Sequence, residues 1–569
     1  MFFNYLKIAF RSSLRNGTTS LVNFLGLTVG IVSSLLIFIY VSHELSYDRF
    51  HDKTDRIFKV LSIDEALGVN NNIVGITMPA LAPGMEKEIP GVENIVRING
   101  SGKTLVEFND NSLYTEKLFF SEPSFFEIFD FELVEGDPKT CLEKPTAAIL
   151  TESMARKVFG DEDPMGKIFS AAGNDDLEVT GILKDPDKPS HIEYDIIVSM
   201  NPTPNDSNYI GYLNSWQSIS QTQYVLLEDP GRKDEIIVEM DSLLRRYDAP
   251  VFWHATLKPL KEVHLYSSDV LFDNFNREKG DIKYVRSLSL IAIIILMIAS
   301  FNYMNLSTAR SAKRAKEVGI RKTAGASRRK LIFQYLSEAI TQVFISLVVS
   351  LAIIEFINNY YNIIDTSVFV HLSNDPVIII YLLALVVFLG ILSGIYPAMI
   401  LSAYKPQVVL KGKFESGKKG LWLRRFLVTI QFIATFVMIV GILVVHSQLR
   451  YTFNKDKGFD TSQIVNIELN SREIRENFEA LRTELEKIPG VKKVATSGSM
   501  PGLGFGRTGV QPEGSSEEEN WIVSIMSMDE NYVPLMNMKL VEGENFRKNM
   551  SIEPLPIIIN ESLTKAVGW

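Results

Sequence analysis

The chain has 569 residues, of which 46% are hydrophobic and 22% charged, and its mean hydropathy is only +0.09. These averages fit neither a bundle of membrane helices alone nor an ordinary soluble enzyme, and they exclude collagen-like and largely disordered chains. The single cysteine, Cys141, excludes an internal disulfide framework and a cysteine-based zinc site, so we expect a small buried thiol. The net charge of −9 argues weakly against a nucleic-acid partner.

Five apolar blocks alternate with polar segments, which explains why the mean hydropathy is close to zero. A helix needs roughly 20 apolar residues to span the hydrocarbon core, and four blocks reach this length without an acidic or basic residue. The remaining block, Ala339 to Ile354, is shorter and reaches this length if its helix begins near Leu331 and its charged ends lie at the membrane interfaces. The predicted spans are Ser20 to Val41, Ser287 to Ala309, Ala339 to Ile354, Pro376 to Tyr404 and Phe426 to Leu449.

The basic connecting segments predict an orientation, because Lys and Arg are retained on the cytoplasmic side of a membrane. Residues 310–337 hold nine basic residues and one acidic residue, and residues 405–425 hold seven and one. Both segments, and with them the N-terminus, are therefore expected in the cytoplasm, where their charges also lie against anionic lipid. The first span follows basic residues as a signal peptide does, but it is longer and lacks a small-x-small cleavage site, so we interpret it as uncleaved.

The crossings divide the chain into six parts. Strand-like runs rich in β-branched residues, such as Ile57 to Ile63 and Tyr224 to Leu227, alternate with helical patterns at Glu152 to Phe159 and Lys233 to Tyr247, so the outer parts are predicted to be α+β. Further strands are predicted at Thr104 to Phe108, Ala147 to Leu150 and Glu178 to Ile182. The parts are the N-terminus with the first span (1–41), a first extracytoplasmic domain (42–286), spans two to four with a cytoplasmic loop at 310–330 (287–404), a basic linker (405–425), the fifth span (426–449) and an incomplete second extracytoplasmic domain (450–569).

An internal repeat covers most of the chain. Ile89-Pro90-Gly91-Val92 recurs as Ile488-Pro489-Gly490-Val491, Leu133-Val134-Glu135-Gly136 recurs as Leu540-Val541-Glu542-Gly543, and Glu152-Ser153 recurs as Glu561-Ser562. The three matches keep their order behind equivalent spans, which predicts a duplication. A complete duplicate would need roughly 800 residues, so we expect the second copy to be cut at Trp569.

No segment has the pattern of an active site. Asn99 to Thr104 looks like the end of a phosphate-binding loop, but Arg97 stands where the leading glycine is needed and a strand follows, so we interpret it as a hairpin turn. The seven histidines lack metal-ligand spacing, and the acidic clusters at 161–163 and 517–519 lack the pattern of a calcium loop. The protein is therefore predicted not to be an enzyme and to bind no metal or cofactor directly.

Small residues and a proline mark the spans. Gly26 and Gly30 form a G-x-x-x-G pattern that lets helix backbones approach closely. Gly390, Gly394 and Pro397 would thin and kink the fourth span near its cytoplasmic end. No span has a charge at its centre, which disfavours a proton- or ion-driven carrier.

The loop after the second span is the most informative segment. Its first part favours a helix, Gly325 is a natural stop, and Ser327 is a plausible N-cap for the helix that enters the third span. Val318 and Ile320 stand among basic residues. A segment that served only as a charged membrane surface would not need these apolar residues, whereas a segment that binds another protein would. We therefore interpret this segment as a docking element for a partner protein.

At this loop the chain resembles the FtsX-like and macrolide-exporter (MacB) permeases of ATP-binding cassette (ABC) systems, in the duplicated eight-span form. The resemblance rests on Lys316-Glu317-Val318-Gly319-Ile320-Arg321-Lys322 and Gly325-Ala326-Ser327, followed by Gln334 and Glu338. Further matches are Gly394 to Ala398, Lys405-Pro406, Asn4 to Lys7 and Glu44 to Phe50.

The resemblance implies a multi-pass α-helical protein of the bacterial inner membrane with MacB-like periplasmic core domains. In that family the loop from Lys316 to Ala326 couples to ABC ATPase subunits. The MacB exporter carries its ATPase on the same chain and this sequence has none, so a separate partner would use ATP. The implied function is export of a drug, antimicrobial peptide or lipid-like substrate, and the implied partners include membrane lipids and a periplasmic adaptor or outer-membrane component. The alternative is a non-transporting subunit that regulates a cell-envelope enzyme or sensor.

Overall fold

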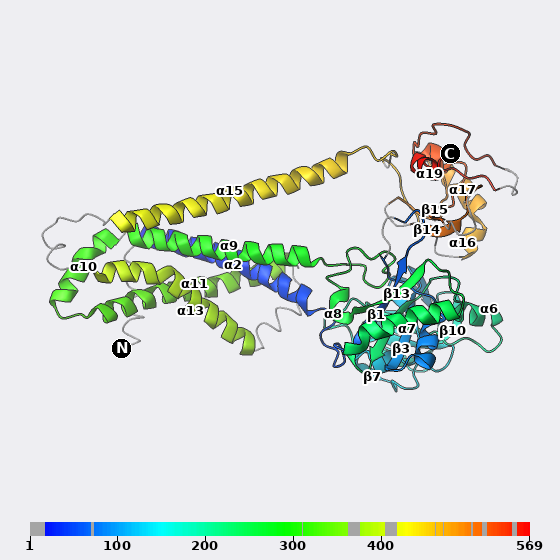
Figure 1. The fold of residues 1–569 in the computed structure, drawn as a ribbon, viewed down its shortest axis with the longest axis horizontal. Coiled ribbons are helices and arrows are strands. Elements are labelled where there is room, and N and C mark those ends of the chain that lie inside the picture. Colours follow the sequence, from blue (N-terminus) through cyan, green and yellow to red (C-terminus); the bar gives the residue numbers. More distant parts are fainter. Residues whose placement is uncertain are drawn as a thin grey trace. The chain divides into compact units, whose positions relative to one another are not determined.

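The computed structural model describes residues 17–69, 73–309, 311–361, 376–403, 418–460, 462–469, 472–501, 505–514, 521–548 and 555–569. The chain forms two compact units (Figure 1). One unit combines the residues up to Leu45 with Ile282–Asn454, and the other combines Ser46–Asp281 with Lys455–Trp569. The chain therefore enters the second unit twice, each time from the end of a long helix.

The first unit contains five long apolar helices. They are α2 (Gly17–Ser46), α9 (Ile282–Ala309), α11 (Arg328–Tyr361), α13 (Pro376–Ala403) and α15 (Lys418–Asn454). Each is long and apolar enough to cross a membrane. The five predicted spans are confirmed, and the third begins at Arg328, so its charged first turn extends the apolar block as expected.

Four of these helices share a core. Leu27, Ile31, Leu35 and Ile39 recur every fourth residue along α2, which places them on one face. They are buried in a cluster with side chains of α9, α11 and α13. The fifth helix, α15, differs because apolar side chains such as Phe432 are exposed along its length in the described part of the chain.

The second unit is built on one mixed sheet. Its strands are β1 (Ile57–Asp64), β2 (Ile73–Val74), β3 (Val92–Gly100), β4 (Thr104–Phe108), β5 (Asn111–Thr115), β6 (Leu118–Ser121), β7 (Leu133–Glu135), β8 (Ala147–Thr151), β9 (Ile168–Ala171), β10 (Asn174–Leu183), β11 (Ile196–Ser199), β12 (Thr222–Leu227) and β13 (Trp253–Pro259). Their order is β13-β1-β12-β3-β6-β11-β8-β10-β9-β4-β5, with β2 beside β1 and β7 beside β10. Most neighbours are antiparallel, and β8/β10 and β6/β11 are parallel.

Helices lie between these strands in sequence. They are α3 (Leu81–Glu88), α4 (Phe125–Ile128), α5 (Glu152–Phe159), α6 (Ser207–Leu213), α7 (Lys233–Arg246), α8 (Leu260–Val263) and a short 3₁₀ turn (Pro230–Arg232). Helices α3 and α7 bury Met85, Ile236 and Met240 against Val225 of β12. Tyr224 points to the opposite face, into an aromatic cluster, because successive residues of a strand alternate sides. The predicted α+β fold is confirmed, as are all five predicted strands and both predicted helices.

The predicted hairpin turn at Asn99 to Thr104 is wrong. Strand β3 ends at Gly100 and β4 begins at Thr104, but β3 pairs with β12 and β6, whereas β4 pairs with β5 and β9. Ser101 is fixed to a third strand, because its N–H donates to Leu118 O over 3.1 Å. The segment therefore crosses between distant strands, and local turn signals do not distinguish such a crossing from a hairpin.

Residues after Lys455 form smaller elements. They are α16 (Arg472–Glu476), α17 (Phe478–Glu486), α18 (Tyr532–Leu535), α19 (Glu561–Val567) and a hairpin of β14 (Gly506–Val510) with β15 (Trp521–Ile525). One hydrogen bond of the first domain recurs here. Glu122 Oε2 accepts from Arg97 N over 2.9 Å, and Asp529 Oδ2 accepts from Thr496 N over 3.0 Å at the equivalent positions of the repeat.

A second bond recurs in the same register. Ser124 Oγ donates to Ile95 O over 2.8 Å, and Asn531 Nδ2 donates to Val494 O over 3.1 Å. The side chains differ between the two copies while the bond is retained, because each holds a loop against the same extended segment. The sequence repeat is therefore also a repeat of local structure.

Candidate coupling site

Helix α10 (Ser311–Thr323) carries the motif that the sequence singled out. It ends where Gly325 adopts a φ of +91°, a conformation that residues other than glycine rarely adopt. The Ala326 N–H then donates to Arg321 O over 3.0 Å, which closes the helix end. Ser327 caps the next helix, since its Oγ accepts from Lys330 N over 3.4 Å. Gly325 and Ser327 thus join α10 to α11 by a short, defined turn.

One apolar side chain anchors α10. Val318 is fully buried, in a small cluster with Leu331 and Tyr335 of α11 and Ala398 and Leu401 of α13. Burying a valine stabilises the contact by about 1.5–3 kcal/mol. The helix is therefore packed onto the ends of two spans and does not lie free.

Polar contacts hold the last turn of α10 in one orientation. Arg321 Nη1 donates to Gln334 Oε1 over 2.7 Å, and Arg321 Nη2 donates to Glu317 Oε1 over 2.6 Å. Lys322 Nζ donates to Ser402 O at the end of α13 over 2.7 Å. Because these contacts reach both α11 and α13, a displacement of α10 would also displace the ends of both spans.

The outward side of α10 carries two exposed side chains. Ile320 is 54% exposed, and the Glu317 side chain is 53% exposed. Gly319 lies between them and is buried. The sequence-based interpretation that Val318 and Ile320 both face a partner is wrong for Val318, because α11 and α13 already cover it.

The remaining motif residues have simpler places. Lys316 lies in α10, and its side chain is outside the described residues. Ala326 packs at the edge of the Val318 cluster. Residues 405–417 of the predicted basic linker (405–425) and the N-terminal basic residues also lie outside the described part of the chain, whereas residues 418–425 belong to α15, which begins earlier than the predicted fifth span. Ser402 is not among the predicted site residues, because it contacts Lys322 only through its backbone carbonyl, which no sequence pattern marks.

The four span glycines singled out by the sequence lie where two helices approach closely. A methyl group built on each would come within 3.3 Å of the neighbouring helix, so only glycine fits without a shift. The approaches are 3.3 Å from Gly26 to Asn302 Nδ2, 2.7 Å from Gly30 to Ala299 Cβ, 2.9 Å from Gly390 to Ile340 Cα and 2.7 Å from Gly394 to Ala339 Cβ. Pro397 lies inside α13, one residue before the Ala398 that contacts the Val318 cluster.

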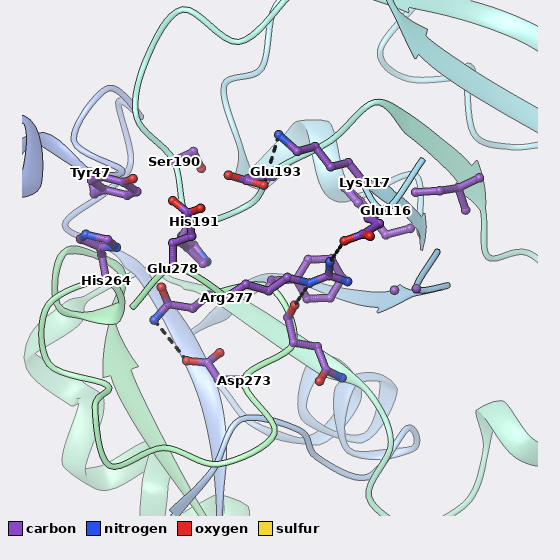
Figure 2. A pocket seen from close by; sticks show the side chains of 17 residues that line it. Tyr47, Glu116, Lys117, Ser190, His191, Glu193, His264, Asp273, Arg277 and Glu278 are labelled. Carbon is purple, nitrogen blue, oxygen red and sulfur yellow. Dashed lines mark hydrogen bonds and ion pairs between the residues drawn. The ribbon is translucent and has the colours of Figure 1, made fainter. Parts of the chain in front are cut away.

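A pocket of about 400 Å³ lined by both charged and apolar side chains lies in the second unit (Figure 2). Two ion pairs border it, Lys117 to Glu193 at 3.3 Å and Arg277 to Glu116 at 3.5 Å. These charges neutralise each other and form no nucleophile and base arrangement. Among the described residues no group of His, Cys, Asp and Glu side chains is placed to hold a metal ion.

Two family models match the chain. Residues 20–243 match the MacB-like periplasmic core domain, and residues 289–406 match the FtsX-like permease C-terminal domain. The chain is an ABC permease of the FtsX/MacB type. The resemblance seen at the loop is thereby confirmed, and the protein is a multi-pass membrane protein with an α+β extracytoplasmic domain.

Individual relatives are distant. The macrolide export ATP-binding/permease protein MacB of Haemophilus ducreyi is 20% identical over 70% of this chain and 54% of its own length. The pyoverdine export ATP-binding/permease protein PvdT of Pseudomonas syringae pv. tomato is 26% identical over 44% of this chain and 36% of its own. The chain thus spans about half or less of the length of these curated relatives.

Two of the solved structures that match each cover about a third of this chain. A permease domain from Porphyromonas gingivalis is 27% identical, with 37% of this chain and 92% of that domain covered and a TM-score of 0.31. The periplasmic region of MacB from Actinobacillus actinomycetemcomitans is 14% identical, with 35% and 88% covered and a TM-score of 0.26.

Proposed function

We propose that this chain is the permease subunit of an export system in which a separate ABC ATPase docks on α10. ATP hydrolysis by that partner would then move the spans and, through them, the extracytoplasmic domains. The family membership supports the permease role. The names of the relatives describe macrolide and pyoverdine export, which supports a role in export. We propose a drug, antimicrobial peptide or lipid-like molecule as the substrate.

The observation that carries the proposal is the contrast between the two sides of α10. Its inner side is anchored on α11 and α13 by Val318, Arg321 and Lys322, while Ile320 and Glu317 remain exposed. A surface loop that served only membrane orientation would need its charges and no such anchoring. A helix that is anchored on two spans and leaves Ile320 and Glu317 exposed fits a docking element that transmits force.

In this arrangement each part has a role. The exposed Ile320 and Glu317 contact the ATPase, and the Val318 cluster passes the displacement on to α11 and α13. The close approaches at Gly390 and Gly394 let α11 and α13 move as one body, because closely packed helices have few voids to absorb a shift. The excess of basic residues around α10 supports a cytoplasmic location for it.

The test is a binding and activity measurement on the full chain in nanodiscs with an ABC ATPase of the MacB type. Ile320→Asp places a charge on the docking surface and is expected to weaken co-purification of the ATPase at least tenfold. Glu317→Lys, which also breaks the contact with Arg321, should act in the same direction. The ATPase activity stimulated by the permease should fall in parallel.

Val238→Asp is the matched control. Val238 is an apolar residue of α7 with 66% exposure, compared with 54% for Ile320, and it lies in the other unit. It should leave ATPase binding unchanged, which separates a local docking effect from a general effect of an added charge. Unchanged co-purification and stimulation in Ile320→Asp and Glu317→Lys would refute the docking role of α10.

A further inference from the structure

The chain that leaves helix α2 is fixed at Asp48, two residues after the helix ends at Ser46. Asp48 is fully buried and has a φ of +56°. Its N–H donates to Pro189 O over 3.0 Å, and its Oδ1 accepts from Ser190 Oγ over 2.8 Å and from His191 N over 3.2 Å. The entry point of the domain is therefore attached to the segment at 189–191.

This attachment continues to the sheet through His191. Its Nδ1 lies 2.7 Å from Asp48 Oδ2, and its Nε2 lies 2.6 Å from the hydroxyl of Tyr224 on β12. Burial pushes the pKa of Asp48 upward, but the charge and hydrogen bonds of His191 hold that pKa below its usual value. An ionised carboxylate only accepts hydrogen bonds, so His191 Nδ1–H donates to Asp48.

A second attachment lies where the chain returns to helix α9, which begins at Ile282. Asp273 forms a buried ion pair with Lys59 of β1, and both side chains are 1% exposed. Asn276 Nδ2 donates to Asp273 Oδ2 over 3.2 Å, and Lys279 Nζ lies 3.8 Å from the same oxygen. The exit point of the domain is therefore attached to β1.

The two attachments meet at one pair of residues. Lys59 of β1 is directly opposite Tyr224 of β12 in the sheet register. Lys59 Nζ also lies 5.7 Å from the centre of the Tyr224 ring, within the range of a cation–π contact. The contacts that hold the end of α2 and the start of α9 thus converge on two neighbouring strands.

We expect the buried contacts of Asp48, His191, Lys59 and Asp273 to stay formed when α2 and α9 move. A buried charge that loses its partner is strongly destabilised, and buried hydrogen bonds are directional, so the groups move together more easily than they separate. Figure 2 shows the same place as a pocket, with Tyr47 beside His264 and with His191 and Asp273 facing it. Tyr47 and His264 stack in parallel with ring centres 3.5 Å apart, which adds another contact to the end of α2.

We propose that Asp48, His191, Tyr224, Lys59 and Asp273 form one mechanical joint, which carries displacements of α2 and α9 into strands β1 and β12. The proposal rests on the proposed function, since it needs an ATP-driven movement to transmit. The joint residues are positioning residues and contact neither ATP nor transported substrate. A chain attached to its domain by ordinary flexible loops would lose much of the displacement in those loops.

The test removes one atom of the joint. Tyr224→Phe deletes the hydroxyl that contacts His191 and keeps the ring beneath Lys59. Tyr194→Phe is the matched control, because Tyr194 is a buried tyrosine of the same core cluster and makes no contact with the joint residues among the hydrogen bonds of the described chain. Spin labels at Val238→Cys and Tyr284→Cys, both exposed, report the distance between α7 and α9 by pulsed electron paramagnetic resonance.

The full labelled chain is measured in nanodiscs with an ABC ATPase of the MacB type, with ATP and vanadate and without nucleotide. The unsubstituted joint and the Tyr194→Phe control should show a nucleotide-dependent change in distance. Tyr224→Phe should retain ATPase binding and hydrolysis but lose at least half of that change. A purely structural role would lower the melting temperature of Tyr224→Phe without reducing the change in distance.

Lys279→Met is the second variant, because the Lys279 side chain is 25% exposed and its loss is a smaller threat to folding. It should reduce the change in distance in the same direction. An unreduced change in both variants, with ATPase bound, would overturn the joint and leave the proposed function standing. Failure of the unsubstituted chain to bind the ATPase or to change its distance would overturn both.

Discussion

Gly30→Ala tests how closely α2 and α9 are packed. A Cβ built on Gly30 lies 2.7 Å from Ala299 Cβ of α9, and its next neighbours are 3.9 Å away. Two methyl groups in contact need close to 4 Å. The substitution therefore creates one steric overlap with one identified atom, which the helices can relieve only by moving apart.

The expected loss of stability follows from two opposing effects. Overpacking a close contact costs about 1–3 kcal/mol. Replacing glycine by alanine inside a helix gains about 0.5–1 kcal/mol. The net effect ranges from no change to a loss of about 2.5 kcal/mol, with a midpoint of about 1 kcal/mol, which corresponds to a decrease in melting temperature of about 2–4 °C for a helical unit of this size.

The assay is thermal unfolding of the full chain in detergent or bicelles. Ala299→Gly, combined with Gly30→Ala, removes the atom that the new methyl group meets and should restore most of the stability. Gly441→Ala in α15 is the control, because among the described residues no other part of the chain comes within 4 Å of a Cβ built there. It should leave the melting temperature unchanged or raise it slightly.

The packing argument would be refuted if Gly30→Ala raised the melting temperature as Gly441→Ala does. It would also fail if Ala299→Gly did not rescue the variant, since the loss would then have another origin. A rescue of at least half of the loss is the result that supports a direct contact between Gly30 and Ala299.

Three further results are expected. Burial lowers the pKa of His51 to about 4, and its Nδ1 accepts from Asp130 N over 3.0 Å, so unfolded chains take up the proton first as the pH falls. The free energy of unfolding from urea titrations should be highest above pH 6.5 and fall by about 2–3 kcal/mol by pH 4, with a smaller fall in His51→Gln. Burial raises the pKa of Cys141 to about 11, so a thiol reagent at pH 8 should modify it only after denaturant is added, and rapid native labelling would contradict this. Val318→Ala should lower the melting temperature more than Ile320→Ala does, because Val318 is buried and Ile320 is exposed. Equal decreases in the two variants would contradict the anchoring of α10 through Val318.

Much of this protein could be predicted from local sequence. The five spans are encoded by the length of their apolar blocks, and the strands and helices around Ile57, Glu152 and Tyr224 by periodicity and turn residues. The end of α10 at Gly325 and the cap at Ser327 depend on a few neighbouring residues, so they too were predicted. Each of these features rests on interactions within a short stretch of chain, which the sequence displays directly.

Other features depend on which distant segments meet, and only the tertiary structure decides that. Val318 and Ile320 are both apolar residues of one helix, yet the ends of α11 and α13 bury the first and leave the second exposed. Lys59 sits in a strand among buried residues, and its partner Asp273 is more than two hundred residues away. A buried charge is tolerable only where the fold supplies its counter-charge. The sequence alone thus determined the long spans, several strands and helices and the family, while the fold determined which face of α10 is exposed and which distant charges pair inside the sheet-containing unit.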